Sequence, residues 1–184
     1  MGVFKIEGGH TLQGEITPQG AKNEALQVLC AVLLTDQKVT IHNLPDIQDV
    51  SKLISLLGNL GVKIQRIGRG SYSFQADEIN LDYLKSEAFY HEGQALRGSI
   101  LIVGPLLTRF GVGYMPKPGG DKIGRRRLDT HFDGFIKLGA HFEYDESNFT
   151  YSVVAERLKG TYMLLEEASI TGTSNVIMAA VLAE

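Results

Sequence analysis

The sequence predicts an α/β (α+β) fold made of repeated units, in which helices are enclosed by sheets. Two observations carry this prediction. Residues 25–76 and 95–155 both read as a helix, a strand, a helix and then two strands. The apolar run that opens each unit also has few polar positions on any side. Because a helix that is apolar all round has to be buried all round, we expect helices inside and sheets outside.

The first unit ends in a hairpin whose two strands alternate apolar and polar residues around the turn GRG at 68–70. Gly61 follows the second helix directly, and glycine most easily takes the left-handed conformation that ends a helix. The elements of this unit are predicted at residues 25–35 (helix), 38–45 (strand), 49–60 (helix), 61–66 and 71–76 (paired strands).

The second unit repeats this order, with Gly139 in the place of Gly61. Its elements are predicted at residues 95–108 (helix), 111–116 (strand), 126–138 (helix), 139–144 and 149–155 (paired strands). Residues 170–183 repeat the opening helix once more, and the chain ends at Glu184, within this third unit. Because repeat folds bury their core by stacking complete units, we expect a fragment of a longer protein. The alternative is a short variant with a capping helix.

Composition narrows the partners that the chain can bind. The 184 residues carry a formal net charge of −3, which gives no overall attraction to nucleic acid or to an anionic membrane. The apolar runs are about half of the roughly 20 residues that cross a bilayer, and the first residues lack a secretory signal, so we expect a cytoplasmic protein. A single cysteine excludes an internal disulfide, and no histidine or cysteine cluster has the spacing of metal ligands. We therefore predict no metal.

The segment GAKNE at residues 20–24 is a candidate anion site. It follows a strand-like segment at 13–17 and precedes the first buried helix. A lysine (Lys22) and an amide (Asn23) beside the free N–H groups of a helix start suit a phosphate or a carboxylate. The alternative is a solvated turn, with Asn23 near the cap position.

The loop KPGGDKIGRRR at residues 117–127 is a second candidate. Its glycines permit close approach of the backbone to a ligand, and its arginines offer forked donors that match phosphate oxygens. A carboxylate, Asp121, lies within this basic loop. A functional loop and an exposed basic turn are both compatible with this pattern.

Two further residues stand out from apolar surroundings. Arg97 interrupts the start of an apolar helix, so it must either face a ligand or pair with a residue such as Glu92. His131 follows the basic loop, and a lone histidine at such a position is usually an ordinary surface or core residue.

Four motifs in order resemble the enolpyruvyl transferase family, over essentially the whole chain. They are EGGHTLQGEIT (7–17), GAKN (20–23), PGGDKIGRRRLDTH (118–131) and ASITGTSN (168–175). Within that family the motifs resemble the branch that acts on UDP-N-acetylglucosamine. The alternative branch, the shikimate-pathway enzymes, carries SKS where this chain has AKN, and it lacks the Pro-Gly-Gly loop. A non-catalytic module that binds sugar nucleotides is another alternative.

The resemblance implies an inside-out α/β barrel of βαβαββ-type units. Residues 1–20 would be a strand segment of a second domain, and residues 21–184 an enolpyruvyl transferase domain that is incomplete at its C-terminus. The implied reaction transfers the enolpyruvyl group of phosphoenolpyruvate to the 3-hydroxyl of UDP-N-acetylglucosamine by addition and elimination. This is the first committed step of peptidoglycan synthesis, and it uses no metal or organic cofactor. The second domain, absent from this chain, would supply the general base.

The resemblance also implies the roles of site residues. Lys22 and Arg97 would hold phosphoenolpyruvate, Asn23 the sugar nucleotide, residues 126–130 the uridine, and Ser169 and Ile170 the diphosphate. The implied catalytic residues are Asp121, Lys22 and Arg97. The implied substrate-binding residues are Lys22, Asn23, Arg97, Arg126, Arg127, Leu128, Asp129, Thr130, Ser169 and Ile170.

This chain departs from the family pattern at three positions. Asp121 stands where most members have a cysteine, so it can donate a proton only if its pKa is raised well above about 3.9. We hypothesise that bound phosphate neutralises the basic loop and lets Asp121 keep its proton. A carboxylate is also a poor target for fosfomycin, the epoxide that alkylates the family cysteine, so we expect resistance. Arg127 replaces a common proline, and Glu167 a lysine of some members.

Overall fold

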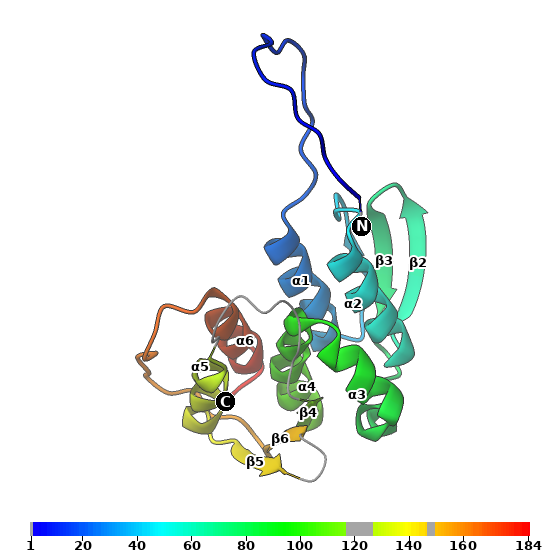
Figure 1. Ribbon diagram of the computed structural model, residues 1–184. Helices are drawn as coiled ribbons and strands as arrows, with labels where there is room; N and C mark the ends of the chain where they lie inside the picture. The colour runs from blue at the N-terminus through cyan, green and yellow to red at the C-terminus, as the bar shows by residue number, and fades with distance from the viewer. Residues whose placement is uncertain (1, 117–126, 147–149) are drawn as a thin grey trace.

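The computed structural model describes residues 2–116, 127–146 and 150–184. Both predicted units are present, each in the order helix, strand, helix, strand, strand (Figure 1). The first contains α1 (Lys22–Ala31), η1 (Val32–Leu34), β1 (Val39–Ile41), α2 (Gln48–Asn59), β2 (Lys63–Gly68) and β3 (Ser71–Gln75). The second contains α4 (Val103–Phe110), β4 (Val112–Pro116), α5 (Asp129–Lys137), β5 (His141–Asp145) and β6 (Thr150–Val154). The third opening helix is α6 (Ile170–Ala180).

The two sheets have the same topology. Each is antiparallel and three-stranded, with the last strand of the unit at its centre, in the orders β1-β3-β2 and β4-β6-β5. The two long helices before the hairpins also end alike. Gly61 and Gly139 have φ angles of 108° and 96°, and the following residue donates its N–H back into the last turn of the helix. The predicted glycine ends of the helices are therefore confirmed.

The segment between the units differs from the prediction. One helix was predicted over residues 95–108, but these residues form η3 (Arg97–Ile102) and most of α4. Two further helical elements, η2 (Leu81–Lys85) and α3 (Glu87–Gln94), precede them. Ser86 caps α3 by accepting a hydrogen bond from the N–H of Phe89, and Leu96 is extended. The cap and this extended residue divide the segment, and Arg97 consequently lies at the start of a 3-10 helix.

The helices and sheets confirm a mixed α/β fold, but they do not close a barrel. The opening helix α4 is buried over residues 103–107, as predicted, and its last three residues are half-buried. In contrast, Val28 of α1 and Ile177 of α6 are 40% and 61% exposed. The enclosure predicted for every opening helix is therefore not shown for α1 and α6, since the described residues form two three-stranded sheets.

Residues 2–20 form no helix or strand and extend away from the two units (Figure 1). The strand expected at 13–17 is therefore not formed. Leu12 and Ile16 are each 94% exposed, and a strand needs a partner for its backbone hydrogen bonds. Within the described residues, no helix combines the length and apolar character that crossing a bilayer requires.

Candidate functional site

The first turns of α5 and α6 lie side by side. Ser169 caps α6, because its Oγ accepts a hydrogen bond from the N–H of Gly172 at 3.1 Å. Gly172 also packs closely on α5, since a Cβ atom at this position would lie 2.9 Å from Cγ2 of Thr130. Helix N-termini present N–H groups and a partial positive charge. Two such ends close together form a favourable place for an anionic group.

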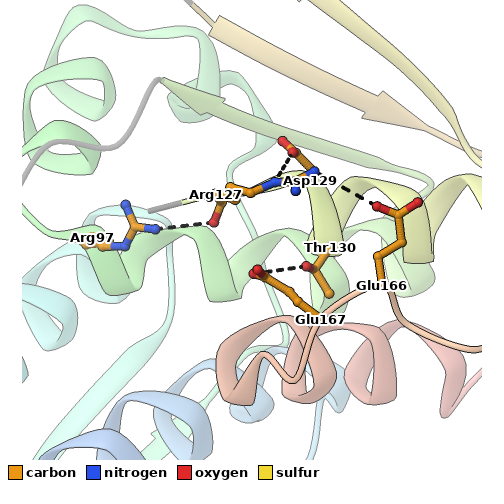
Figure 2. A network of polar contacts seen from close by, with 6 residues as sticks. All are labelled: Arg97, Arg127, Asp129, Thr130, Glu166 and Glu167. Atoms are coloured by element: carbon orange, nitrogen blue, oxygen red, sulfur yellow. Dashed lines mark hydrogen bonds and ion pairs between the residues drawn. The ribbon is translucent and has the colours of Figure 1, made fainter. Parts of the chain in front are cut away.

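Arg97, the first residue of the η3 helix, contacts the segment just before α5 (Figure 2). Its side chain donates from Nη2 to the main-chain oxygen of Arg127 at 3.4 Å. Glu92, the alternative partner, accepts hydrogen bonds from Tyr83 at 2.7 Å and from Asn59 at 2.8 Å instead. Arg97 therefore lies against the residues that lead into α5, and its role in binding a ligand stays a prediction.

Arg127 pairs with two carboxylates (Figure 2). Its Nε donates to Asp129 at 2.6 Å, and its Nη2 lies 3.9 Å from an oxygen of Glu166. The hydrogen bond to Asp129 is the main cause that raises the pKa of Arg127, and the charges of Glu167 and Glu166 add to it. Glu167 in turn accepts a hydrogen bond from Thr130 at 3.3 Å. The structure thus brings Arg97, Arg127, Asp129 and Thr130 together with the segment that leads to Ser169.

A buried polar cluster that sequence reasoning missed lies beneath these residues. His131 is only 2% exposed, and Asn175 is fully buried. Nδ2 of Asn175 lies 3.0 Å from Nδ1 of His131, and Oγ1 of Thr171 lies 3.4 Å from its Nε2. Burial, and to a lesser extent the charge of Arg97, lowers the pKa of His131 to about 4. The imidazole is therefore neutral at neutral pH. The sequence showed two signals of this cluster, His131 itself and an amide, Asn175, inside the largely apolar run at 170–183.

Lys22 lies at the start of α1, as predicted, where its amine pairs with Asp49 of α2 at 2.9 Å. Asn23 is in the first turn of α1 and does not cap it, because Ala21 is the cap residue and no side chain bonds there. One turn further on, Leu26 packs against Gly98, whose Cβ atom would lie 3.0 Å from Cδ1 of Leu26. Because residues i and i+4 share a helix face, Lys22 is on the side of α1 that faces η3.

Two of the predicted site residues, Asp121 and Arg126, lie outside the described residues. Helix α5 was expected from residue 126, but it begins at Asp129, so Arg127 and Leu128 precede it. Their place before the helix leaves the main-chain oxygen of Arg127 available to Arg97. Ser169 and Ile170 occupy the cap and the first position of α6.

Among the described residues, two cavities of about 580 and 350 Å³ are lined by residues other than those predicted for the site. The larger lies between the end of α4 and residues 155–158, and the smaller between residues 17–19, the start of α2 and the β2–β3 hairpin. Neither is lined by a predicted site residue, so neither carries the functional argument.

The sequence of this chain matches a known protein family. A family model described as EPSP synthase (3-phosphoshikimate 1-carboxyvinyltransferase) matches residues 6–184. The chain is 60% identical over its whole length to a UDP-N-acetylglucosamine 1-carboxyvinyltransferase of Porphyromonas gingivalis, and 56% identical to one of Bacteroides thetaiotaomicron. It spans 42% of the length of each of these curated relatives.

The fold is also similar to that of solved structures. An EPSP synthase from Acinetobacter baumannii superposes with a TM-score of 0.67, over 93% of this chain and 39% of that one. The sequence identity is 17%, so this likeness concerns the fold alone.

Proposed function

We propose, since this chain belongs to the EPSP synthase (3-phosphoshikimate 1-carboxyvinyltransferase) family, that it is part of an enzyme that transfers the enolpyruvyl group of phosphoenolpyruvate to the 3-hydroxyl of UDP-N-acetylglucosamine. The high identity with curated UDP-N-acetylglucosamine 1-carboxyvinyltransferases along the whole chain carries this proposal. The arrangement of cations and helix ends supports it, because both substrates are anions.

In this proposal, the cations bind one anionic substrate and the helix ends bind the other. Lys22 and Arg97, on neighbouring elements, hold the phosphate and carboxylate of phosphoenolpyruvate. The paired starts of α5 and α6 receive the diphosphate at Ser169 and Ile170. The uridine lies along residues 126–130, and Asn23 contacts the sugar.

The proposed reaction is an addition followed by an elimination. Asp121 donates a proton to the methylene carbon of phosphoenolpyruvate, while the oxygen of the sugar 3-hydroxyl bonds to the neighbouring carbon and gives its proton to a base. The new methyl group then loses a proton, the carbon–carbon double bond re-forms, and phosphate leaves. Bound phosphate neutralises the positive charge of the basic loop and so lets Asp121 keep its proton, because cations without this anion would favour the ionised carboxylate.

Three finer features belong to the same proposal. Residues beyond this chain complete an inside-out barrel, with the sheets covering the exposed sides of α1 and α6. A second domain supplies the general base and pairs with residues 1–20. The reaction takes place in the cytoplasm, as the first committed step of peptidoglycan synthesis.

The experiment that tests this function measures release of phosphate from phosphoenolpyruvate. It uses the protein extended to the length of its relatives, with UDP-N-acetylglucosamine or with shikimate 3-phosphate as acceptor. We expect phosphate release with the sugar nucleotide only, and its loss in the Asp121→Asn variant. Turnover with shikimate 3-phosphate alone would overturn the choice of acceptor, and undiminished turnover by Asp121→Asn would remove Asp121 from the role of acid.

A further inference from the structure

Arg127 is the residue at which three separate segments meet (Figure 2). Its main-chain oxygen accepts the hydrogen bond of Arg97, from the start of η3. Its guanidinium binds Asp129, in the first turn of α5, and lies 3.9 Å from Glu166, in the segment before α6. One residue thus connects the candidate anion-binding arginine to both helix starts.

The segment that leads to α6 depends on a few contacts for its position. Residues 155–169 contain no helix or strand, and several of their side chains, such as Tyr162 (96% exposed), point into solvent. Near its start, the N–H of Lys159 donates to Leu138. Lys137 donates to the oxygen of Leu164 further along. At the end next to Ser169, side-chain contacts to Glu166 and Glu167 hold the segment against α5.

The carboxylates near Arg127 make its guanidinium less available to a substrate anion. Asp129 is already hydrogen bonded to the guanidinium, Glu166 lies 3.9 Å from it, and Glu167 adds a third negative charge nearby. A substrate phosphate at the guanidinium would have to displace these side chains or meet their negative charge, which is unfavourable. The same charges make the guanidinium well suited to holding protein segments together.

We infer that Arg127 is a positioning residue, which sets the start of α6 against Arg97 through Asp129 and Glu166 and does not bind substrate phosphate itself. The inference rests on the proposed function, because it assigns the diphosphate of the sugar nucleotide to the helix start that Arg127 positions. Arg127 then determines how well the sugar nucleotide fits, and it contributes little to the chemical step.

A charge-reversal pair in the extended protein tests this role. Arg127→Glu repels Glu166, so the KM for UDP-N-acetylglucosamine rises, by about two- to fivefold for one exposed ion pair, while kcat changes less. The double variant Arg127→Glu/Glu166→Arg restores the pair with residue 166 in reverse and brings KM part of the way back toward the wild-type value, because the new carboxylate at position 127 still repels Asp129. If Arg127 bound phosphate directly, the double variant would keep the raised KM, because a negative charge would remain at position 127.

Two further variants serve as controls for this test. Arg69→Glu changes the net charge by the same amount at the exposed tip of the β2–β3 hairpin, so it leaves KM unchanged if the effect at residue 127 is local. Arg127→Lys keeps the charge and retains most of the affinity, even if the reversed variant folds poorly. An unchanged KM in Arg127→Glu, or no recovery in the double variant, would overturn the inference.

A second readout does not depend on activity. Chymotrypsin cleaves after exposed aromatic side chains, and Tyr162 lies in the segment that Arg127 holds. We expect faster cleavage after Tyr162 in Arg127→Glu and a rate closer to that of the wild-type protein in the double variant. If the wild-type protein releases no phosphate and the variants still differ in cleavage rate as expected, the proposed function fails and the positioning role stands. Equal cleavage rates in all variants would refute the positioning role.

Discussion

Asn175 donates a hydrogen bond from Nδ2 to Nδ1 of His131, over 3.0 Å, in the buried space between α5 and α6. An imidazole nitrogen that accepts a hydrogen bond carries no proton, so the neutral ring of His131 has its proton on Nε2, toward Thr171. The same amide donates to the main-chain oxygen of Ile100 and accepts from the N–H of Gly104. Asn175 thereby joins the elements that carry Arg97 and Asp129.

The first prediction concerns stability at acidic pH. The pKa of His131 falls from 6.5 to about 4 on folding, so the unfolded chain binds more protons between these values. Its contribution is complete above pH 6.5 and decreases as the pH falls toward 4. We expect the free energy of unfolding in urea to drop by about 2–3 kcal/mol between pH 7 and pH 4.5 on account of this residue.

The matched control for this prediction is another histidine. His131→Gln should flatten the pH dependence, whereas His10→Gln should leave it unchanged, because His10 lies in the exposed N-terminal segment. An equally steep loss of stability in His131→Gln would contradict the role of His131.

The second prediction concerns the amide itself. Asn175→Ala leaves the N–H of Gly104, the oxygen of Ile100 and Nδ1 of His131 without this partner in a buried site. We expect a loss of about 3 kcal/mol in the free energy of unfolding. Ser174→Ala, at the exposed neighbouring position, should cost no more than about 0.5 kcal/mol. Similar values for the two variants in urea titrations would show that the hydrogen bonds of Asn175 contribute little.

The third prediction compares two helical glycines. A Cβ atom at Gly104 of α4 would lie 2.4 Å from the main-chain oxygen of Asn175, so Gly104→Ala has to push α4 and α6 apart. We expect a loss of about 1–3 kcal/mol. A Cβ atom at Gly58 of α2 would meet Cδ1 of Ile64 at an ordinary 3.6 Å, so Gly58→Ala should raise stability by up to about 1 kcal/mol. Thermal unfolding of both variants checks the opposite signs.

The fourth prediction concerns fosfomycin. We expect no covalent adduct at residues 1–184 of the extended protein, because Asp121 offers no thiolate and the only cysteine of this chain, Cys30, is fully buried with a raised pKa. Asp121→Cys should gain a single adduct. Peptide mapping by mass spectrometry locates any adduct, and one at Asp121 of the wild-type protein would contradict the expectation.

Local chemistry made much of the fold predictable. The alternation around residues 68–70 and the glycines Gly61 and Gly139 predicted both hairpins and both helix ends, because strand period and left-handed backbone are properties of short segments. The division of residues 87–110 into α3, η3 and α4 was missed. It depends on the cap at Ser86 and on packing of Gly98 against Leu26, and no local period records that contact.

The sequence by itself determined the order of the elements, the repeat and the candidate cations at Lys22 and Arg97, because these follow from residue type and spacing. Only the tertiary structure decided the partners of these cations and of Arg127: Asp49 for Lys22, the main-chain oxygen of residue 127 for Arg97, and a group of carboxylates for Arg127. It also revealed the buried pair of His131 and Asn175. The physical reason is that the contacts of Lys22 with Asp49, of Arg97 with residue 127 and of His131 with Asn175 join residues 27 to 44 positions apart, and such contacts form only when the helices pack.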